Sequence, residues 1–334
     1  MTRPLQPLRR LLRLSAVLAT LCGATPLPAL AQASAQPSDR PLTIVVPYAG
    51  GGAADPVVRP LAQRLQERLG RPVVVDNRPG ANGLIGTQHV LRQPADGNTI
   101  LYHITSLIQN VALSRAKPAY DFNKDIQPLV LLGRQSVVLV VPGASPYRTF
   151  PDLAKAVRAS PTSFAYGSYG SGSTSHIYGE ALRAALNVEM PHAAFRGTAP
   201  LVQEMLGGRI PMAFVSATTA IERDKDKTLR AVAVASDRRM ELLPHVPTLA
   251  EMGYPGFEST GWWGLFLRSG TPPAEADLLL STIRDILREQ DMQARLRLAG
   301  LEPSEEGPEQ IAAGMRADYR HWEALSRRFN ITSD

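Results

Sequence analysis

The residues best suited to chemistry occupy positions 44–59, IVVPYAGGGAADPVVR, where an apolar run meets three consecutive glycines and then Asp55-Pro56. Aspartate before proline is typical of a helix start, with Asp55 as the N-cap and Pro56 at the first helical position. A glycine turn that enters a helix directs backbone N–H groups and the positive end of the helix dipole at one small space. The pattern predicts that this glycine loop, residues 48–55, binds a carboxylate.

A second stretch of the same kind lies in the other half of the chain. Residues 166–176 read YGSYGSGSTSH and lead from a strand pattern through glycines and hydroxyls into a helix pattern. We call residues 168–175 the serine loop. Two such loops facing each other across a cleft would grip a small molecule that carries carboxylates. Thr105-Ser106 and Arg196-Gly197-Thr198, each next to a helix pattern, would supply further donors.

Each of these features also has a purely structural interpretation, and both interpretations stay open. The three glycines fit a tight strand-to-helix connection, and the serine loop fits a solvated surface turn. Trp262 and Trp263 are adjacent in a strand pattern. Because neighbouring strand residues point to opposite faces, we expect one in the core and one at a cleft wall. His176, in a first helical turn, is expected to bond to the loop backbone rather than to act in acid–base chemistry.

The sequence motifs for catalysis, cofactor binding and metal binding are all incomplete. The six histidines, at positions 89, 103, 176, 192, 245 and 321, lack metal-ligand spacing, so no metal is expected. Ser175 stands where a dinucleotide fingerprint needs its third glycine, and Tyr166 stands where a nucleophile elbow needs its leading glycine. We therefore expect no cofactor and no enzyme. An exported serine hydrolase stays open only if a serine, a histidine and an aspartate meet in space.

The first 31 residues predict an export signal. Four arginines and no acid precede an apolar run at 14–30, and Ala29-Leu30-Ala31 resembles a cleavage site. Removing this segment takes four arginines from a net charge of +6, so 6 − 4 = +2, together with the only cysteine, Cys22. A thiol-free product fits an oxidising compartment. We expect a periplasmic monomer cleaved near Ala31, and no nucleic-acid partner, because no basic stripe with interleaved aromatics occurs.

The remaining chain alternates short β-branched runs with helical patterns, which predicts an α/β fold of parallel sheets with helices on both faces. Its length favours two domains. Helical spacing follows Asp55 and ends at Gly70, and Thr149 with Asp152 resembles a capping box. Helices are also expected at 177–186, 291–298 and 308–328. The predicted strands are residues 42–47, 73–76, 99–104, 136–141, 163–166, 211–215, 229–235 and 261–267.

The order of these motifs resembles one family. The Bug-type receptors of tripartite tricarboxylate transport systems carry an export signal followed, in this order, by segments similar to RPLTIVVPYAGGGAAD, VVVDNRPGANGLIG, PADGNTIL, YDFNKDIQPL, FAYGSYGSGSTSH, FRGTAPLVQEMLGGRI, LRAVAVAS, LPHVPTLAEMG and WWGLFLRSGTP. The resemblance covers essentially the whole mature chain. It implies a type II-like periplasmic binding protein, with two doubly wound lobes, two crossover strands and the ligand cleft between the lobes.

By this resemblance the crossover strands correspond to residues 136–141 and 261–267. Lobe 1 would comprise residues 40–138 plus 260–334, and lobe 2 residues 139–259. The implied function is to capture a small carboxylate-bearing metabolite and to present it to the large and small subunits of a membrane transporter. A sensor that docks onto a membrane kinase would use the same fold and ligand. It stays open as an alternative beside the serine hydrolase.

The resemblance also implies how the ligand is held, largely through backbone amides and bridging waters of the two loops. The implied ligand-binding residues are Tyr48, Gly51, Gly52, Ala53, Asp55, Ser106, Ser168, Ser171, Ser173, Thr174, Thr198 and Trp262. Many relatives carry an aspartate where this chain has Val215 before Ser216, which disfavours amino acids as ligands. Tyr169 and Ser171 stand where small residues and asparagine are frequent, so a narrower cleft is expected.

Overall fold

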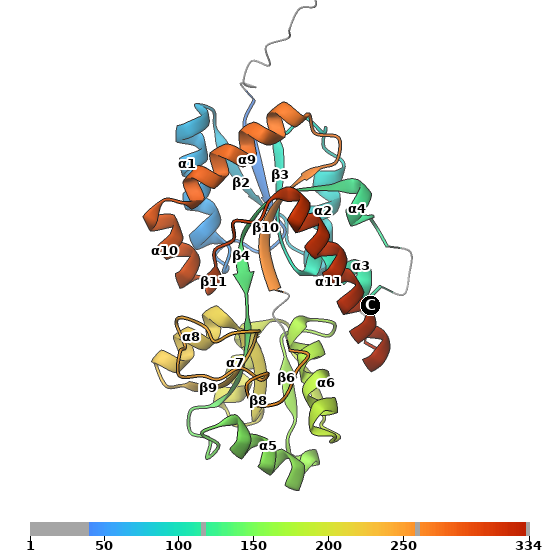
Figure 1. The fold of residues 1–334 in the computed structure, drawn as a ribbon, viewed down its shortest axis with the longest axis vertical. Coiled ribbons are helices and arrows are strands. Elements are labelled where there is room, and N and C mark those ends of the chain that lie inside the picture. Colours follow the sequence, from blue (N-terminus) through green and yellow to red (C-terminus); the bar gives the residue numbers. More distant parts are fainter. Residues whose placement is uncertain (1–39, 115–117, 258–260, 332–334) are drawn as a thin grey trace, which may run out of the picture. The chain divides into compact units, whose positions relative to one another are not determined.

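The computed structural model describes residues 40–114, 118–257 and 261–331. The predicted export signal and its cleavage site near Ala31 lie outside these residues. Two β-sheets, each flanked by helices, make up the described chain (Figure 1). Among the described residues, the search for a helix both long and apolar enough to span a bilayer finds none.

The first sheet has six strands in the order β11-β4-β10-β3-β1-β2. Its parallel part comprises β1 (Leu42–Val46), β2 (Val73–Asn77) and β3 (Thr99–Ile104). Strand β10 (Gly261–Arg268) runs antiparallel to β3 and to β4 (Ile126–Gln135), and the short β11 (Leu301–Glu302) pairs antiparallel with β4. This sheet is therefore mixed.

The second sheet has five strands in the order β7-β6-β8-β5-β9. Strand β6 (Tyr166–Ser168) is parallel to β7 (His192–Ala194) and to β8 (Met212–Ser216). Strand β5 (Val137–Pro142) is antiparallel to β8 and to β9 (Leu229–Ala235). Only Ser136 separates β4 of the first sheet from β5 of the second.

The prediction of parallel sheets is right for six strands and wrong for the other five. Parallel neighbours need a crossover connection, usually a helix, whereas β4 passes directly into β5 and β10 returns from the other sheet in the opposite direction. The strands of the first sheet lie within residues 42–135 and 261–302, and those of the second within 137–235. The predicted lobe boundaries themselves stay a prediction, because residues 258–260 are outside the described chain.

The local predictions have mixed outcomes. Thr149 accepts a hydrogen bond from the Asp152 amide, as predicted, and opens α5 (Phe150–Ala159). Strands β4, β7 and β11 were missed, because Pro128 and Gly133 interrupt the β4 pattern, His-Ala-Ala in β7 has no β-branched residue, and β11 has only two residues. The strand predicted at 163–166 begins later, since Pro161 opens a 3₁₀ turn, η2 (Pro161–Ser163).

The helices cover the sheets with apolar faces. In α1 (Asp55–Leu69), Val57, Val58, Leu61 and Leu65 are buried, and the helix ends at Gly70 in the left-handed conformation, φ 65°. The first sheet is also covered by α2 (Leu84–Leu91), α3 (Ser106–Ala112), α4 (Phe122–Asp125), α9 (Pro273–Leu287), α10 (Gln290–Leu298) and α11 (Pro308–Phe329). The second sheet carries α5, α6 (Thr174–Leu186), α7 (Thr198–Leu206) and α8 (Ala217–Lys225).

Candidate functional site

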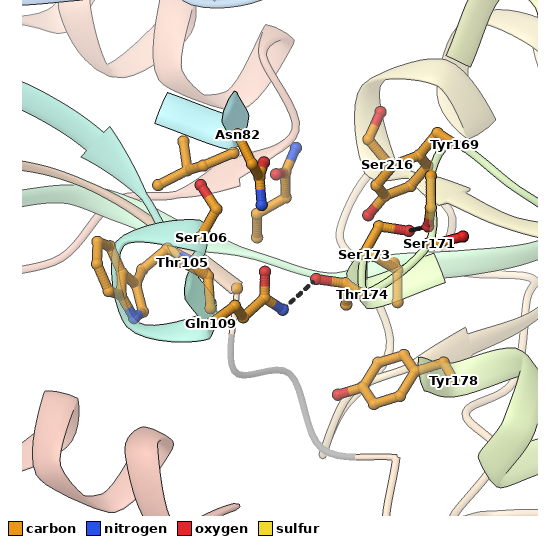
Figure 2. A pocket seen from close by; sticks show the side chains of 16 residues that line it. Asn82, Thr105, Ser106, Gln109, Tyr169, Ser171, Ser173, Thr174, Tyr178 and Ser216 are labelled. Atoms are coloured by element: carbon orange, nitrogen blue, oxygen red, sulfur yellow. Dashed lines mark hydrogen bonds between the residues drawn. The ribbon is translucent and has the colours of Figure 1, made fainter. Parts of the chain in front are cut away.

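A cavity of about 330 Å³ lies between elements of the two sheets (Figure 2). Its sixteen lining residues are Asn82, Ile104, Thr105, Ser106, Gln109, Gln135, Val137, Tyr169, Gly170, Ser171, Ser173, Thr174, Tyr178, Ser216, Gly261 and Trp262. Among these described residues, none is a lysine, arginine, histidine, aspartate or glutamate. The volume suits a small metabolite, and the polar groups are neutral hydroxyls and carboxamides.

One wall of the cavity follows the end of β3. Thr105 and Ser106 lie at the start of α3, and the Ser106 hydroxyl is 2.8 Å from the Tyr48 hydroxyl. Behind them, the buried His103 accepts a hydrogen bond at Nδ1 from the Ile104 amide. Burial lowers the pKa of His103 to about 4 and raises the pKa of Tyr48. Both side chains are therefore neutral at physiological pH and act as a rigid support for Ser106.

The opposite wall is the serine loop at the start of α6. Ser173 caps this helix by accepting a hydrogen bond from the His176 amide, and its hydroxyl donates to the Gly170 carbonyl at 2.6 Å. The Gly172 amide donates to His176 Nδ1 at 3.1 Å, so His176 bonds to the loop backbone as predicted. These bonds fix the loop, and Ser171, which is exposed, is among the residues that line the cavity.

A hydrogen bond between described residues joins the two walls. Gln109 Nε2 in α3 donates to Thr174 Oγ1 in α6 at 2.9 Å, and Figure 2 shows this bond across the cavity. The bond connects an element of the first sheet with an element of the second. Moving these elements apart would break it.

Trp262 and Trp263 point to opposite faces of β10, as predicted for neighbouring strand residues. Trp262 lines the cavity, and its backbone amide donates to Thr105 Oγ1 at 2.9 Å. Its indole Nε1 donates to Asp318 Oδ2 of α11 at 2.8 Å. Trp263 points the other way, where its ring meets Tyr102 edge to face in the core. The cavity wall formed by Trp262 is therefore anchored to a buried carboxylate.

Comparison with known proteins identifies the receptor family of this chain. The family model described as "Tripartite tricarboxylate transporter family receptor" matches residues 57–331. The chain belongs to this receptor family. The UPF0065 protein in the tcbD-tcbE intergenic region of Pseudomonas sp. (strain P51) is 35% identical over 296 residues, which cover 88% of both chains.

Two solved structures are similar over nearly their whole length. The periplasmic binding protein BugD has 30% identity and a TM-score of 0.77, with 88% of this chain and 99% of BugD covered. R. palustris Rpa4515 with adipate has 29% identity and a TM-score of 0.79, with 88% and 98% covered. The predicted Bug-type family and the two-lobed α/β binding-protein fold are confirmed.

Within this member of the receptor family, the structure brings five of the predicted site residues to the cavity. They are Ser106, Ser171, Ser173, Thr174 and Trp262. Tyr48 stands one hydrogen bond behind Ser106 and is outside the lining. Thr198 is the first residue of α7 and also lies outside the lining.

The glycine loop of this receptor also lies outside the cavity. Gly51, Gly52 and Ala53 are exposed, and the Gly51 amide donates to Asp55 Oδ2 at 2.7 Å. Arg59 Nε donates to the same oxygen at 3.0 Å. The prediction of Asp55 as the N-cap of α1 is wrong, because Ala54 holds that position without a side-chain bond. The hydrogen bond from the Gly51 amide is the main cause that lowers the pKa of Asp55, and Arg59 lowers it further.

Ser168 has a different environment from the rest of the serine loop. Its side chain is fully buried, lies outside the cavity lining and is 2.8 Å from His192 Nε2. The His192 ring stacks on His176, with 3.9 Å between the ring centroids. Burial lowers the pKa of His192 to about 4, with the neighbouring His176 as a second cause. Ser168 thus stabilises the base of the loop.

Several residues that line the cavity of this receptor have no role in the sequence prediction, among them Asn82, Gln109, Gln135 and Tyr178. Two of them had a signal. Asn82 lies between glycines in PGANG, and Gln109 lies one helical turn after Ser106. Gln135 and Tyr178 lie in a missed strand and inside a helix, and their orientation depends on tertiary packing.

Proposed function

We propose that this chain is a periplasmic receptor that encloses a small carboxylate-bearing metabolite and presents it to the membrane subunits of a tripartite transporter. The observation that carries the proposal is the cavity, which elements of both sheets line with neutral hydrogen-bonding groups. Membership of the receptor family supports the role. The similar structure of Rpa4515 holds adipate, a dicarboxylate, which supports the ligand class.

The composition of the cavity explains how such a ligand can be held. Hydroxyls of Ser106, Ser171 and Thr174 can donate to a carboxylate without the desolvation that a buried arginine would require. Trp262 and Val137 supply an apolar surface for the carbon skeleton of the ligand. Because the loops are already fixed by internal bonds, little further ordering opposes binding.

The same composition disfavours amino acids. Ser216 lines the cavity and the preceding Val215 is fully buried, so neither offers a carboxylate to an ammonium group. An ammonium transferred from water into this cavity would lose hydration without gaining a counter-charge. We therefore assign plain carboxylates or aromatic acids to the site. Calorimetry that finds tight aspartate or glutamate binding, and no response to dicarboxylates or aromatic acids, would contradict this assignment.

A ligand screen on refolded protein, free of carried-over solute, tests the receptor role. A bound carboxylate should raise the melting temperature, because ligand at 100 times its Kd stabilises the fold by about 2.7 kcal/mol. Ser171→Ala should weaken that ligand by roughly three- to tenfold, the effect of one hydrogen bond of about 1 kcal/mol. Ser163→Ala removes an exposed hydroxyl at the end of η2 and is the matched control, expected to leave the affinity unchanged.

A serine hydrolase has one observation in its favour, the contact between Ser168 and His192. We assign no enzymatic activity to this pair. The Ser168 side chain is fully buried and its hydroxyl donates to the Gly170 carbonyl, so a substrate carbonyl cannot approach Oγ. Ester or amide turnover that disappears in Ser168→Ala would establish the hydrolase instead.

The location and partners belong to the same proposal. An export signal cleaved near Ala31 would deliver the chain to the periplasm, where it would act as a monomer and dock onto the large and small membrane subunits. Neighbouring genes for those two subunits would support a transport role. A neighbouring membrane kinase without them would point to a sensor instead.

A further inference from the structure

The turn that carries Asn82 has an unusual backbone. It follows β2 and includes η1 (Ala81–Gly83), and four consecutive residues have positive φ: Gly80 at 130°, Ala81 at 46°, Asn82 at 50° and Gly83 at 92°. The left-handed region is unfavourable for alanine and only somewhat less so for asparagine. Such strain persists only where the surrounding structure imposes it, and it is concentrated at functional sites.

The surroundings of the turn show what imposes this conformation. A Cβ atom at Gly83 would lie 2.5 Å from His103 Nε2 and 3.3 Å from the Tyr48 hydroxyl. The turn is therefore packed against the same two side chains that support Ser106. The result places Asn82 on the cavity beside Ser106 and Gln109, opposite the serine loop (Figure 2).

Hydrogen bonds fix the orientation of the Asn82 side chain. Asn110 Nδ2 donates to the Asn82 backbone carbonyl at 3.0 Å, and a carbonyl can only accept. Asn110 Oδ1 is therefore the acceptor in the second bond of the pair, and Asn82 Nδ2 donates to it at 3.1 Å. Within the described part of the chain, no hydrogen bond reaches Asn82 Oδ1. Asn82 thus offers the cavity an acceptor oxygen.

A carboxylate alone cannot use that oxygen, because an ionised carboxylate only accepts hydrogen bonds. We infer that Asn82 is a specificity-determining residue of this site, and that it selects carboxylates that also carry a hydroxyl group, whose O–H donates to Asn82 Oδ1. A ligand ammonium would also donate, but the residues that line the cavity include no carboxylate to balance its charge. The inference rests on the proposed carboxylate receptor and narrows its ligand class.

The test compares pairs of probes that differ by one hydroxyl: succinate with malate, propionate with lactate, and glutarate with 2-hydroxyglutarate. Calorimetry on the refolded protein should show at least one pair in which the hydroxy acid binds roughly five- to tenfold more tightly. Asn82→Gly tolerates the positive φ and removes the side chain, with its Oδ1 and its bond to Asn110. It should bring the two members of that pair within about twofold of each other.

Ala81→Gly is the matched control. It makes the same kind of backbone change at the neighbouring residue, which has positive φ but does not line the cavity. This variant should keep the full preference for the hydroxy acid, which separates loss of the amide from release of backbone strain. A preference that disappears equally in both variants would overturn the inference.

The remaining outcomes separate this inference from the proposed function. If plain carboxylates bind and a hydroxyl adds nothing in any pair, the receptor proposal stands and the role of Asn82 is overturned. A preference that persists in Asn82→Gly also overturns it. If no carboxylate in the set binds the unaltered protein, the proposed ligand class fails, and the inference fails with it.

Discussion

Asp318 gives the sharpest prediction, because it is a carboxylate in the interior of the protein. Its residue is only 8% exposed, and Oδ2 accepts the hydrogen bond from the Trp262 indole. Loss of hydration raises the pKa of Asp318 from the ordinary 3.8 to about 6. The Trp262 bond and the positive charge of Arg134 oppose this rise, and the negative charge of Glu306 adds to it.

The sign of the pH dependence follows from the raised pKa. Between pH 4 and 6 the folded protein binds more protons at Asp318 than the unfolded chain does, so the contribution of this group falls as pH rises. The interval between 3.8 and about 6, at roughly 1.4 kcal/mol per pKa unit, gives a loss of about 3 kcal/mol. Well below pH 3.8 both states are protonated, and the contribution of Asp318 is constant.

Asp318→Asn removes the titration and keeps an oxygen that can accept the Trp262 bond. Urea unfolding followed by tryptophan fluorescence at pH 4, 5, 6 and 7.5 should show the variant gaining roughly 2.5 kcal/mol on the unaltered protein across this range, because the unfolded-state carboxyl is already more than half ionised at pH 4. The amide adds two N–H donors whose burial lowers the variant's stability by a constant of about 1–3 kcal/mol at every pH, so the change with pH is the diagnostic quantity. Asp285→Asn, an exposed carboxylate in α9, is the control with no such change. A stability difference that stays constant with pH, or that moves against the variant, would refute the reasoning.

Two further substitutions test the loops around the site. Gly83→Ala should lower the free energy of unfolding by about 2 kcal/mol or more, because the new Cβ would clash with His103 Nε2 and the residue has a φ of 92°. Chemical unfolding measures this loss. A loss below about 0.5 kcal/mol, typical of a surface substitution, would contradict the packing. Asp55→Ala should cost about 1 kcal/mol by releasing the Gly51 amide, with the carboxylate affinity from calorimetry changed less than about twofold. A much larger affinity loss at an unchanged melting temperature would put the glycine loop in the binding site.

The parts of the fold that the sequence predicts correctly are those set by local chemistry. The Thr149 cap, the end of α1 at Gly70 and the bond from Gly172 to His176 each depend on residues within a few positions of each other. Strand direction was predicted less well, because β4 and β5 are joined through Ser136 without a helix, and no local pattern marks that connection. Tertiary packing decides such features.

The same distinction between local chemistry and tertiary packing applies to the residues of the candidate site. Ser171, Ser173 and Thr174 were identified because they follow a strand in a loop that starts a helix, and this arrangement is visible in the sequence. Gln135 and Tyr178 were missed, because their place at the cavity follows from β4 pairing with β10 and from α6 packing against the second sheet. Side chains that reach a site from regular elements carry no local signal of their own.

The glycine loop shows why an anion-binding pattern does not by itself identify a ligand site. The pattern predicts that a carboxylate meets the amides before α1, and one does, but it belongs to Asp55. An external carboxylate at the Gly51 amide would have to displace Asp55 and break its bond with Arg59, so much of the gain would be offset. The serine loop holds its helix start with the neutral Ser173 instead, which adds no charge to repel an anion. Of the two loops, the one without an internal carboxylate is therefore better suited to an external one, and it is the loop that lines the cavity.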